Sequence, residues 1–465
     1  MLTLKIASRN ILRNARRSIM VVATIAIGSA AILMFGAYVA YIKYAEQTAA
    51  VQATGHLELF RNGYFHYGTG SPGLWGIDDY QAVIDRIKGD SALSSAITVV
   101  TPIQAVTGIA GNFEKNSSKT FLGTGFVPSE RDRMKQWNEY GTGSIGLKRS
   151  GLKDDEPAKG IAGAGMMRIL GFCEHFGLGD CAPASPPQIR AAPSGPTSTL
   201  LTDLADRERQ ALPASDATVP TIDLLAATAG GAPNIVSLQI IRVDLQPFKE
   251  FDDLYVGMPL GLAQTLIYGR SKPKATGIVI QLHRTEDLPW AKTRLTALIQ
   301  QEKLDLELHD FTELNQQYNQ VIDLFTSILN FIVSVMGFVV LFTVSNTMGM
   351  SVVERTDEIG TIRALGARRS AVRRLFLVEG ALLGVTGATA GLFAAYFVAM
   401  AINQAGMTWI PPGSAGPVPL RLYFAGPDLL AVATWGGLIL VAIAAAFAPA
   451  LRAGNLPIVD ALRHV

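Results

Sequence analysis

Residues 19–42 read IMVVATIAIGSAAILMFGAYVAYI, an apolar run with no charged side chain. A helix of roughly 20 apolar residues crosses the hydrocarbon core of a bilayer. Comparable apolar blocks lie at 321–350, 375–401 and 429–450. A cleaved signal peptide is the alternative for the first block, but its apolar stretch exceeds the roughly 7–15 residues of such a signal. The sequence therefore predicts four transmembrane helices.

The composition agrees with a membrane protein. Apolar residues make up 49% of the 465 residues and charged residues only 17%, whereas charged residues are about a quarter of an ordinary globular chain. The formal net charge of +2 gives no electrostatic support for a nucleic-acid partner.

Lysine and arginine collect beside particular ends of the apolar blocks, and this asymmetry predicts orientation because cytoplasmic loops are enriched in both residues. The basic segments are 1–18, 351–374 and 451–465. We expect these segments to be cytoplasmic and the segments 43–308 and 402–428 to be extracytoplasmic. The predicted location is a bacterial inner membrane, with both termini in the cytoplasm.

The long segment 43–308 has the pattern of a mixed α+β domain. Strand-like runs lie at 56–60, 97–100, 237–243 and 276–282, and helix-like runs at 80–87, 260–268 and 291–302. The predicted fold is thus an α-helical membrane protein with four transmembrane helices plus a large mixed α+β extracytoplasmic domain on a helical stalk. Within that domain, residues 172–220 are rich in proline and read as a loop-rich insert.

The only cysteines, Cys173 and Cys181, lie at the start of this insert. We expect a disulfide between them, because oxidising compartments preserve such bonds. A metal site that adds Glu174 and His175, and free thiols, are the alternatives. The spacing matches no standard zinc pattern, so no metal is expected.

Apolar residues recur at three- and four-residue steps from Phe311 to Phe325, with no glycine or proline before the second apolar block. The pattern predicts one continuous helix over 309–350 that combines a stalk with the second span. A break near Gln320 is the alternative.

The loop 351–374 contains a recognisable stretch. Residues 354–367, ERTDEIGTIRALGA, resemble the run that follows the second span in permeases of the MacB/LolC/FtsX type, the type VII ABC transporter permeases. Residues 7–17 are similar to the entry of that family's first span, and residues 449–463 are similar to its exit. Patches at 55–57, 123–128 and 224–234 resemble the LolC/LolE-like branch with a MacB-type core.

The resemblance implies that this loop is a coupling helix that docks into an ABC ATPase. The implied coupling residues are Glu354, Arg355, Glu358, Ile359, Ile362, Arg363, Leu365 and Gly366. Ile359, Ile362 and Leu365 would lie along one side of the helix, and Gly366 would end it in a left-handed conformation. The alternative is a basic loop that lies on anionic lipid head groups.

No Gly-x-x-x-x-Gly-Lys-Ser/Thr run occurs in the sequence, so we expect no nucleotide-binding P-loop. ATP hydrolysis, with ATP and Mg, is expected in a separate ATPase subunit, and no cofactor is expected on this chain. The other expected partners are a second permease subunit, identical or different, a periplasmic cargo or acceptor protein, and membrane lipid.

The third block carries Gly380, Gly384, Gly387 and Gly391, and glycine at this spacing lets helices approach closely in lipid. We expect packing within the subunit, with packing across a dimer as the alternative. Glu379 is the one acid in this block. Because Arg373 and Arg374 are near it in the sequence, we expect Glu379 to form an interfacial ion pair. An ion-coupling role is the alternative.

The leading hypothesis is an ABC transporter permease that releases or exports lipoproteins, lipids or other amphiphiles. The second is an FtsX-like regulatory subunit that controls a periplasmic partner such as a cell-wall hydrolase. An enzyme in the outer domain has little support, because no nucleophile motif or acid–base pair stands out in the sequence.

Overall fold

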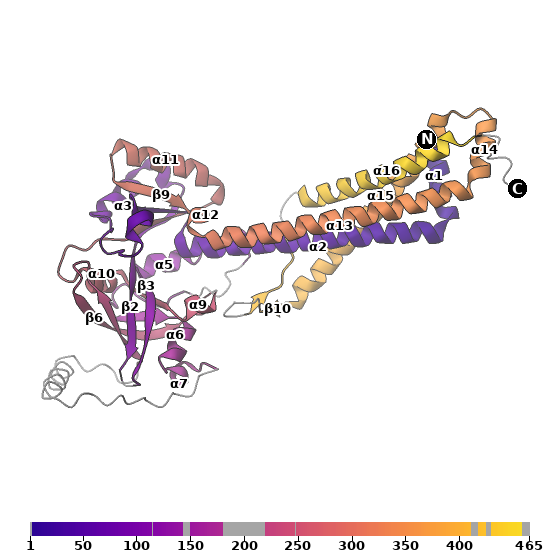
Figure 1. Cartoon of the computed structure of the whole chain (residues 1–465). Coiled ribbons are helices and arrows are strands. Elements are labelled where there is room, and N and C mark those ends of the chain that lie inside the picture. The colour runs from indigo at the N-terminus through magenta and orange to yellow at the C-terminus, as the bar shows by residue number, and fades with distance from the viewer. Residues whose placement is uncertain are drawn as a thin grey trace. The chain divides into compact units, whose positions relative to one another are not determined.

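The computed structural model describes residues 2–113, 115–142, 149–179, 219–246, 248–410, 417–424 and 429–457 (Figure 1). The chain divides into two compact units. The helical unit comprises 1–44, 319–409 and 419–465, and the α/β unit comprises 45–318 and 410–418. The predicted combination of long apolar helices with a mixed α/β domain is confirmed.

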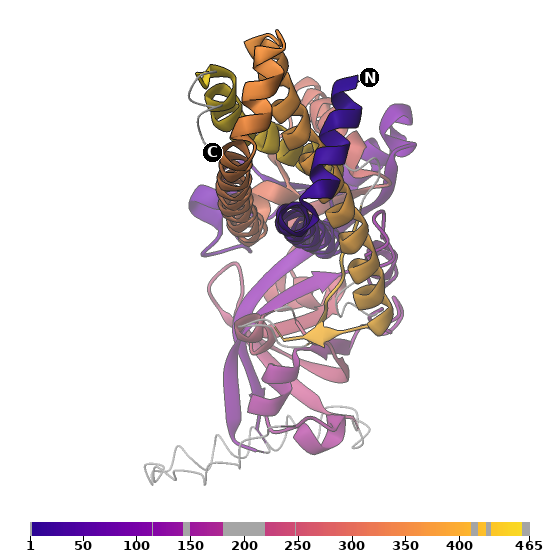
Figure 2. The same ribbon diagram turned by 90° about the vertical axis from the view of Figure 1, so that its right-hand side faces the viewer.

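Among the described residues, four helices are long and apolar enough to cross a membrane. They are α2 (Ala15–Thr54), α13 (Gln316–Glu354), α15 (Arg369–Ala405) and α16 (Leu429–Asn455). Two shorter helices complete the unit, α1 (Leu2–Arg13) and α14 (Thr356–Ala364), and the short strands β10 (Thr408–Trp409) and β11 (Val418–Pro419) follow α15. Figure 2 shows α1 beside the long helices, where it packs on α15.

The glycines of α15 face two different neighbours. A Cβ added to Gly380 would lie 2.7 Å from Ala446 Cβ, and one added to Gly384 would lie 3.0 Å from Ala442 Cβ, both on α16. A Cβ on Gly387 would lie 2.6 Å from Ile25 Cβ on α2. Gly391 likewise lies against Ala26 and Ser29 of α2. All four glycines therefore serve contacts within this chain, because any larger side chain would push the helices apart.

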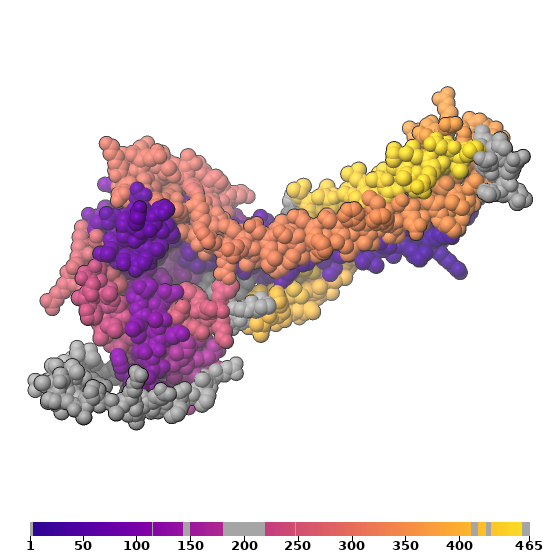
Figure 3. Space-filling view, viewed as in Figure 1, coloured from indigo at the N-terminus to yellow at the C-terminus, as the bar shows by residue number. Residues whose placement is uncertain are grey.

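Helix α13 is much less covered than the others. Only 11% of its most apolar stretch is buried, against 39% for α2. Figure 3 shows its flank uncovered along the helical unit. Its exposed side chains include Phe331, Phe338 and Phe342. This face is suited to contact with lipid or with another protein.

The prediction of one helix over 309–350 is wrong at its start. Residues Leu306–Asp310 form strand β9, and the Asp310 carboxylate then caps α12 (Phe311–Leu314). Asn315 interrupts the helix with φ −107° and ψ 72°. From Gln316 the helix α13 is unbroken through Gln320, where the alternative placed a break. The three- and four-residue spacing of apolar residues does not reveal strand β9, because this strand forms by pairing with β1, which is far away in the sequence.

In the α/β unit, nine strands of the described residues form one sheet in the order β3-β7-β4-β6-β5-β2-β8-β1-β9, and β2 also pairs with β3. The strands are β1 (Leu57–Arg61), β2 (Ile97–Asn112), β3 (Ser117–Phe126), β4 (Lys159–Ala162), β5 (Thr221–Ala227), β6 (Pro233–Val243), β7 (Tyr255–Pro259), β8 (Gly277–Leu282) and β9. The long strand β2 joins two parts, because 97–103 pairs with β8 and 103–112 pairs with β3.

Short helices cover the sheet. They are α3 (Tyr80–Gly89), α4 (Ser91–Ser94), α5 (Pro128–Met134), α6 (Ala164–Ile169), α7 (Cys173–Phe176), α9 (Lys249–Asp252), α10 (Leu260–Tyr268) and α11 (Leu288–Gln301), with a π-helical turn at Tyr64–Gly68 and a 3₁₀ turn at Thr285–Asp287. One apolar core joins α6 and α10 to strands β2 to β7, and another joins α3 and α11 to β1 and β8. Most of the insert 172–220 lies outside the described residues.

Strand β1 places an acid inside the α/β unit. Glu58 is 3% exposed, and its Oε1 has no hydrogen-bond partner among the described residues. Burial raises the pKa of Glu58 to about 8, although the Arg131 guanidinium opposes that shift. The folded unit therefore holds this carboxyl protonated at neutral pH, because a buried carboxylate is costly.

We predict that Gly391→Ala destabilises the helical unit by about 1–3 kcal/mol, the usual cost of overpacking. The reason is that the new methyl group would meet Ser29 Cβ at 2.5 Å. Gly436→Ala on α16 is the matched control, because its added Cβ meets nothing within 4 Å. Thermal unfolding of the purified full-length protein measures both. Equal melting temperatures for the two variants would contradict the packing described here.

We predict a pH-dependent effect for Glu58→Gln. Because the pKa rises from 4.5 to about 8 on folding, the native state holds an extra proton between these values, and stability falls as pH rises through this window. The variant should gain about 4–5 kcal/mol over wild type at pH 9 and less than about 1 kcal/mol at pH 5. Exposed Glu250→Gln is the control. Parallel curves of stability against pH for wild type and Glu58→Gln would refute the prediction.

Candidate functional site

The junction between α13 and α14 contains one buried cation. Helix α13 ends at Glu354, and Arg355 leaves the helical conformation with φ −113° and ψ 21° before α14 begins. The Arg355 side chain is only 8% exposed. A buried guanidinium requires a charged partner, since its desolvation otherwise costs several kcal/mol.

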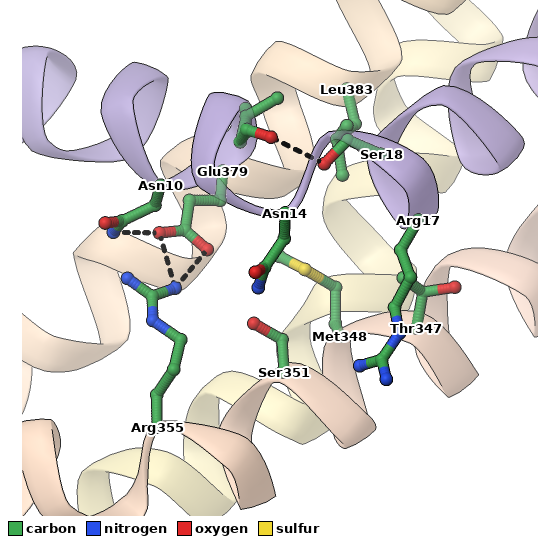
Figure 4. Close-up of a pocket in the computed structure, with 11 residues that line it drawn as sticks. Asn10, Asn14, Arg17, Ser18, Thr347, Met348, Ser351, Arg355, Glu379 and Leu383 are labelled. Carbon is green, nitrogen blue, oxygen red and sulfur yellow. Dashed lines mark hydrogen bonds and ion pairs between the residues drawn. The ribbon is translucent and has the colours of Figure 1, made fainter.

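That partner is Glu379 of α15, which is 5% exposed (Figure 4). Arg355 Nη1 donates to Glu379 Oε1 at 3.1 Å and to Oε2 at 3.2 Å. Asn10 Nδ2 of α1 donates to the same Oε1 at 2.6 Å. The guanidinium also lies 5.8 Å from the centre of the Phe376 ring. We call Arg355, Glu379 and Asn10 the buried lock, because they join α1, α15 and the start of α14.

Two more exposed pairs surround the buried lock. Arg13 Nη2 donates to Glu358 Oε1 at 2.6 Å, and Arg17 lies 2.5 Å from Glu354. Burial acts to raise the pKa of Glu358, but hydrogen bonds from Arg13 and Arg355 outweigh it and hold that pKa below its ordinary value. Pairs this exposed contribute little stability on their own, about 0–1 kcal/mol. The first pair connects α1 to α14, and the second connects the start of α2 to the end of α13.

A small polar cavity lies beside the buried lock, with a volume of about 30 Å³. Its polar lining includes Asn14, Ser18, Thr347 and Ser351 (Figure 4). Ser18 Oγ donates to Ile11 O at 3.0 Å across the break between α1 and α2. The volume exceeds the roughly 10–15 Å³ that one water needs, so the cavity has room for a water molecule beside these polar side chains.

The apolar residues of α14 do not share one side. Ile359 is 5% exposed and packs into the helical unit, whereas Ile362 is 45% exposed and Leu365 is 85% exposed. The expectation that all three lie together is wrong, because each step of three residues turns roughly 60° short of a full circle in an α-helix. Because of this rotation, Ile362 and Leu365 lie exposed and form an apolar pair at the end of α14.

The end of α14 is fixed by backbone geometry. Gly366 has φ 95°, and the Ala367 N–H donates to Ile362 O at 3.2 Å. These are features of a helix that ends through a left-handed glycine. Arg363 donates to the carbonyl oxygen of Leu456, so the last turn is tied to the end of α16.

Glu379 forms the kind of ion pair that was expected, but with a different partner. Arg373 and Arg374 precede it by six and five residues on the same helix, which places them on other faces of α15. Arg373 Nη2 instead donates to Asn455 Oδ1 at 2.9 Å. Sequence reasoning missed Asn10 and Arg13 as members of this site. Their only signal was the position of a polar, basic helix directly before the first apolar block.

The cysteine site is only partly described. Cys173 begins α7, together with Glu174 and His175. Its expected partner Cys181 lies outside the described residues. The disulfide therefore stays a prediction.

Comparison with known proteins finds similarity centred on the second half of the chain. Residues 330–458 match the family model "FtsX-like permease C-terminal", a stretch that includes most of α13 and all of α14, α15 and α16. The ABC transporter permease YtrF of Bacillus subtilis (strain 168) is 36% identical over 124 residues, which are 26% of this chain and 28% of that protein.

A second relative is the macrolide export ATP-binding/permease protein MacB of Shewanella sp. (strain W3-18-1). It is 28% identical over 220 residues, which are 46% of this chain and 31% of that protein. The chain thus spans less than a third of the length of these relatives. Among solved structures, the periplasmic region of MacB from Actinobacillus actinomycetemcomitans aligns with a TM-score of 0.33 and 13% identity, covering 58% of this chain and 95% of that one.

We predict that Glu379→Gln destabilises the helical unit by about 3–5 kcal/mol, because it removes the buried counter-ion of Arg355 and leaves only the more exposed Glu358, whose Oε2 lies 3.3 Å from Arg355 Nε. Replacing both residues, as in Arg355→Met with Glu379→Leu, should cost less than Glu379→Gln alone. The exposed pair offers a control, Arg17→Gln, with a cost of at most about 1 kcal/mol. Thermal unfolding of the full-length protein compares the three variants with wild type. A double variant that is the least stable of all would contradict this account.

Proposed function

We propose that this chain is the permease subunit of an ABC transporter, and that α14 receives the movement of a separate ATPase. The observation that carries the proposal is the exposed apolar pair Ile362–Leu365 on a helix that the buried lock fixes to the bundle. The match of residues 330–458 to an FtsX-like permease model supports it.

The apolar pair has the chemistry of a docking contact. Leu365 is 85% exposed at the end of α14, and a large apolar side chain in this position gains free energy only when a partner covers it. Asp357 and Glu358 lie in the first turn of α14 and Arg363 in the last. A cleft that covers the apolar pair and meets these charges would hold α14 in one orientation.

The rigidity of α14 supports the transmission of force. A helix of nine residues has marginal stability alone, so a free loop would absorb the movement of an ATPase. Here Arg355 and Ile359 anchor its start inside the bundle, and Arg363 anchors its end to α16. Helices α2 and α13 contribute residues to both units of the chain. Movement of the bundle would therefore reach the α/β unit through continuous helices.

The proposal includes a topology and a second subunit. Segments 1–18, 351–374 and 451–465 face the cytoplasm of a bacterium, and the α/β unit lies on the other side of the inner membrane, in accordance with the distribution of lysine and arginine. The uncovered apolar face of α13 supports contact with lipid and with a second permease subunit. The cargo is a lipoprotein, a lipid or another amphiphile that reaches the α/β unit from outside.

We predict that Ile362→Asp abolishes coupling to the ATPase without unfolding the protein. The side chain is 45% exposed, so a charge there leaves the core intact but makes an apolar cleft unfavourable. Ile362→Leu keeps the apolar contact and should behave as wild type. Affinity purification in mild detergent, followed by identification of co-purifying proteins and measurement of ATP hydrolysis, gives both readouts. An ATPase that remains bound and fully active with Ile362→Asp would refute the docking role.

A further inference from the structure

A second candidate site lies in the α/β unit, far along the chain from α14. A pocket of about 330 Å³ lies between α6, α7 and the end of β6. Its walls are mainly apolar, with Phe176, Leu178, Ile241, Val243 and Leu245. A volume of this size lies at the lower end of small-molecule sites, which occupy about 300–1,000 Å³, and it admits an alkyl chain of medium length.

One buried carboxylate holds the walls of the pocket in place. Asp252 is 1% exposed and accepts hydrogen bonds from the backbone N–H groups of Ala164 at 3.1 Å and Gly165 at 2.7 Å. Its Oδ1 also accepts from the backbone N–H of Gln246 at 2.9 Å. The first turn of α6 and the segment after β6 are thereby tied together. A pocket built this way is formed before any ligand arrives, which is typical of small-molecule sites.

The pocket also contains two arginines in different electrostatic states. Arg242 shares the single charge of Asp244 with Lys135, because its Nη2 lies 2.7 Å from Asp244 Oδ1 and Lys135 Nζ lies 3.4 Å from Asp244 Oδ2. Arg168 donates from Nε to Gly179 O at 3.0 Å, but among the described residues it has no carboxylate partner. Within the part of the chain that the structure describes, its terminal nitrogens thus provide a positive charge without a counter-ion at the edge of an apolar pocket. A planar guanidinium is well suited to bind a carboxylate or phosphate.

We infer that this pocket binds a single-chain amphiphile with a carboxylate head, with the alkyl chain on the apolar walls and the carboxylate on Arg168. The terminal nitrogens of Arg168 match the two oxygens of one carboxylate, which carries one negative charge. This inference rests on the proposed function, since it names the chemical class of an amphiphilic cargo, and it assigns the residues that recognise it.

The test is photo-crosslinking of the full-length protein in nanodiscs with a decanoic acid that carries a diazirine. We expect labelling of the peptides that contain Phe176, Leu178 or Leu245. Arg168→Gln should reduce labelling about tenfold, because a hydrogen bond to a charged group is lost. The matched control is exposed Arg270→Gln, which removes the same charge elsewhere in the α/β unit and should label as wild type.

Two further probes test the head group and the alkyl chain of the ligand separately. The corresponding decanol probe, with the same diazirine, should label weakly, and a decanoate shortened by one methylene should bind about fourfold more weakly. Leu245→Gln tests the apolar wall at an exposed position and should also reduce labelling. Equal labelling of wild type and Arg168→Gln, or equal labelling by the alcohol probe, would overturn the inference.

The outcome is independent of the ATPase. Labelling that persists while Ile362→Asp leaves ATP hydrolysis unchanged would contradict the proposed coupling but not this site. Loss of coupling in Ile362→Asp without any labelling of the pocket would contradict this site alone.

Discussion

A single buried charge constrains the whole helical unit. Once Arg355 enters the bundle it must be neutralised, because a guanidinium without a partner in a low-dielectric interior is strongly unfavourable. Glu379 neutralises it from α15, and Asn10 completes the hydrogen bonding from α1. Elements that are hundreds of residues apart in the sequence are thereby required to meet at one point. The position of α14 follows from that meeting.

The packing of α15 makes this arrangement possible. Its glycines allow α16 to approach on one side and α2 on the other, so the helix that carries Glu379 lies between two neighbours. Close backbone approach supplies dispersion contacts, which matter in lipid because no hydrophobic effect draws helices together there. The fixed position of Glu379 then determines where Arg355 can go. The glycines of α15 therefore bring this helix close to its neighbours, and the ion pair formed by Glu379 on the same helix positions Arg355.

Much of this could be predicted from the sequence, and the failures have clear physical causes. The four spans, and strands such as β6 and β8, follow from local patterns of apolar residues. Strand β9 was missed because its partner β1 is more than 200 residues away along the chain. Likewise, charge spacing within one helix could not reveal that Glu379 pairs with Arg355. The spacing predicts Ile362 and Leu365 on one side with Ile359, but a step of three residues falls roughly 60° short of a full helical turn.

The central claim is that α14 is a rigid part of the bundle because of the buried lock. Amide hydrogen exchange of the full-length protein in nanodiscs tests it most directly, through peptides that cover α14. The account predicts that Ile359 to Leu365 exchange as slowly as the last turns of α13 in the wild type, and much faster in Glu379→Gln, while the α/β unit is unchanged. Fast exchange of α14 in the wild type would contradict it.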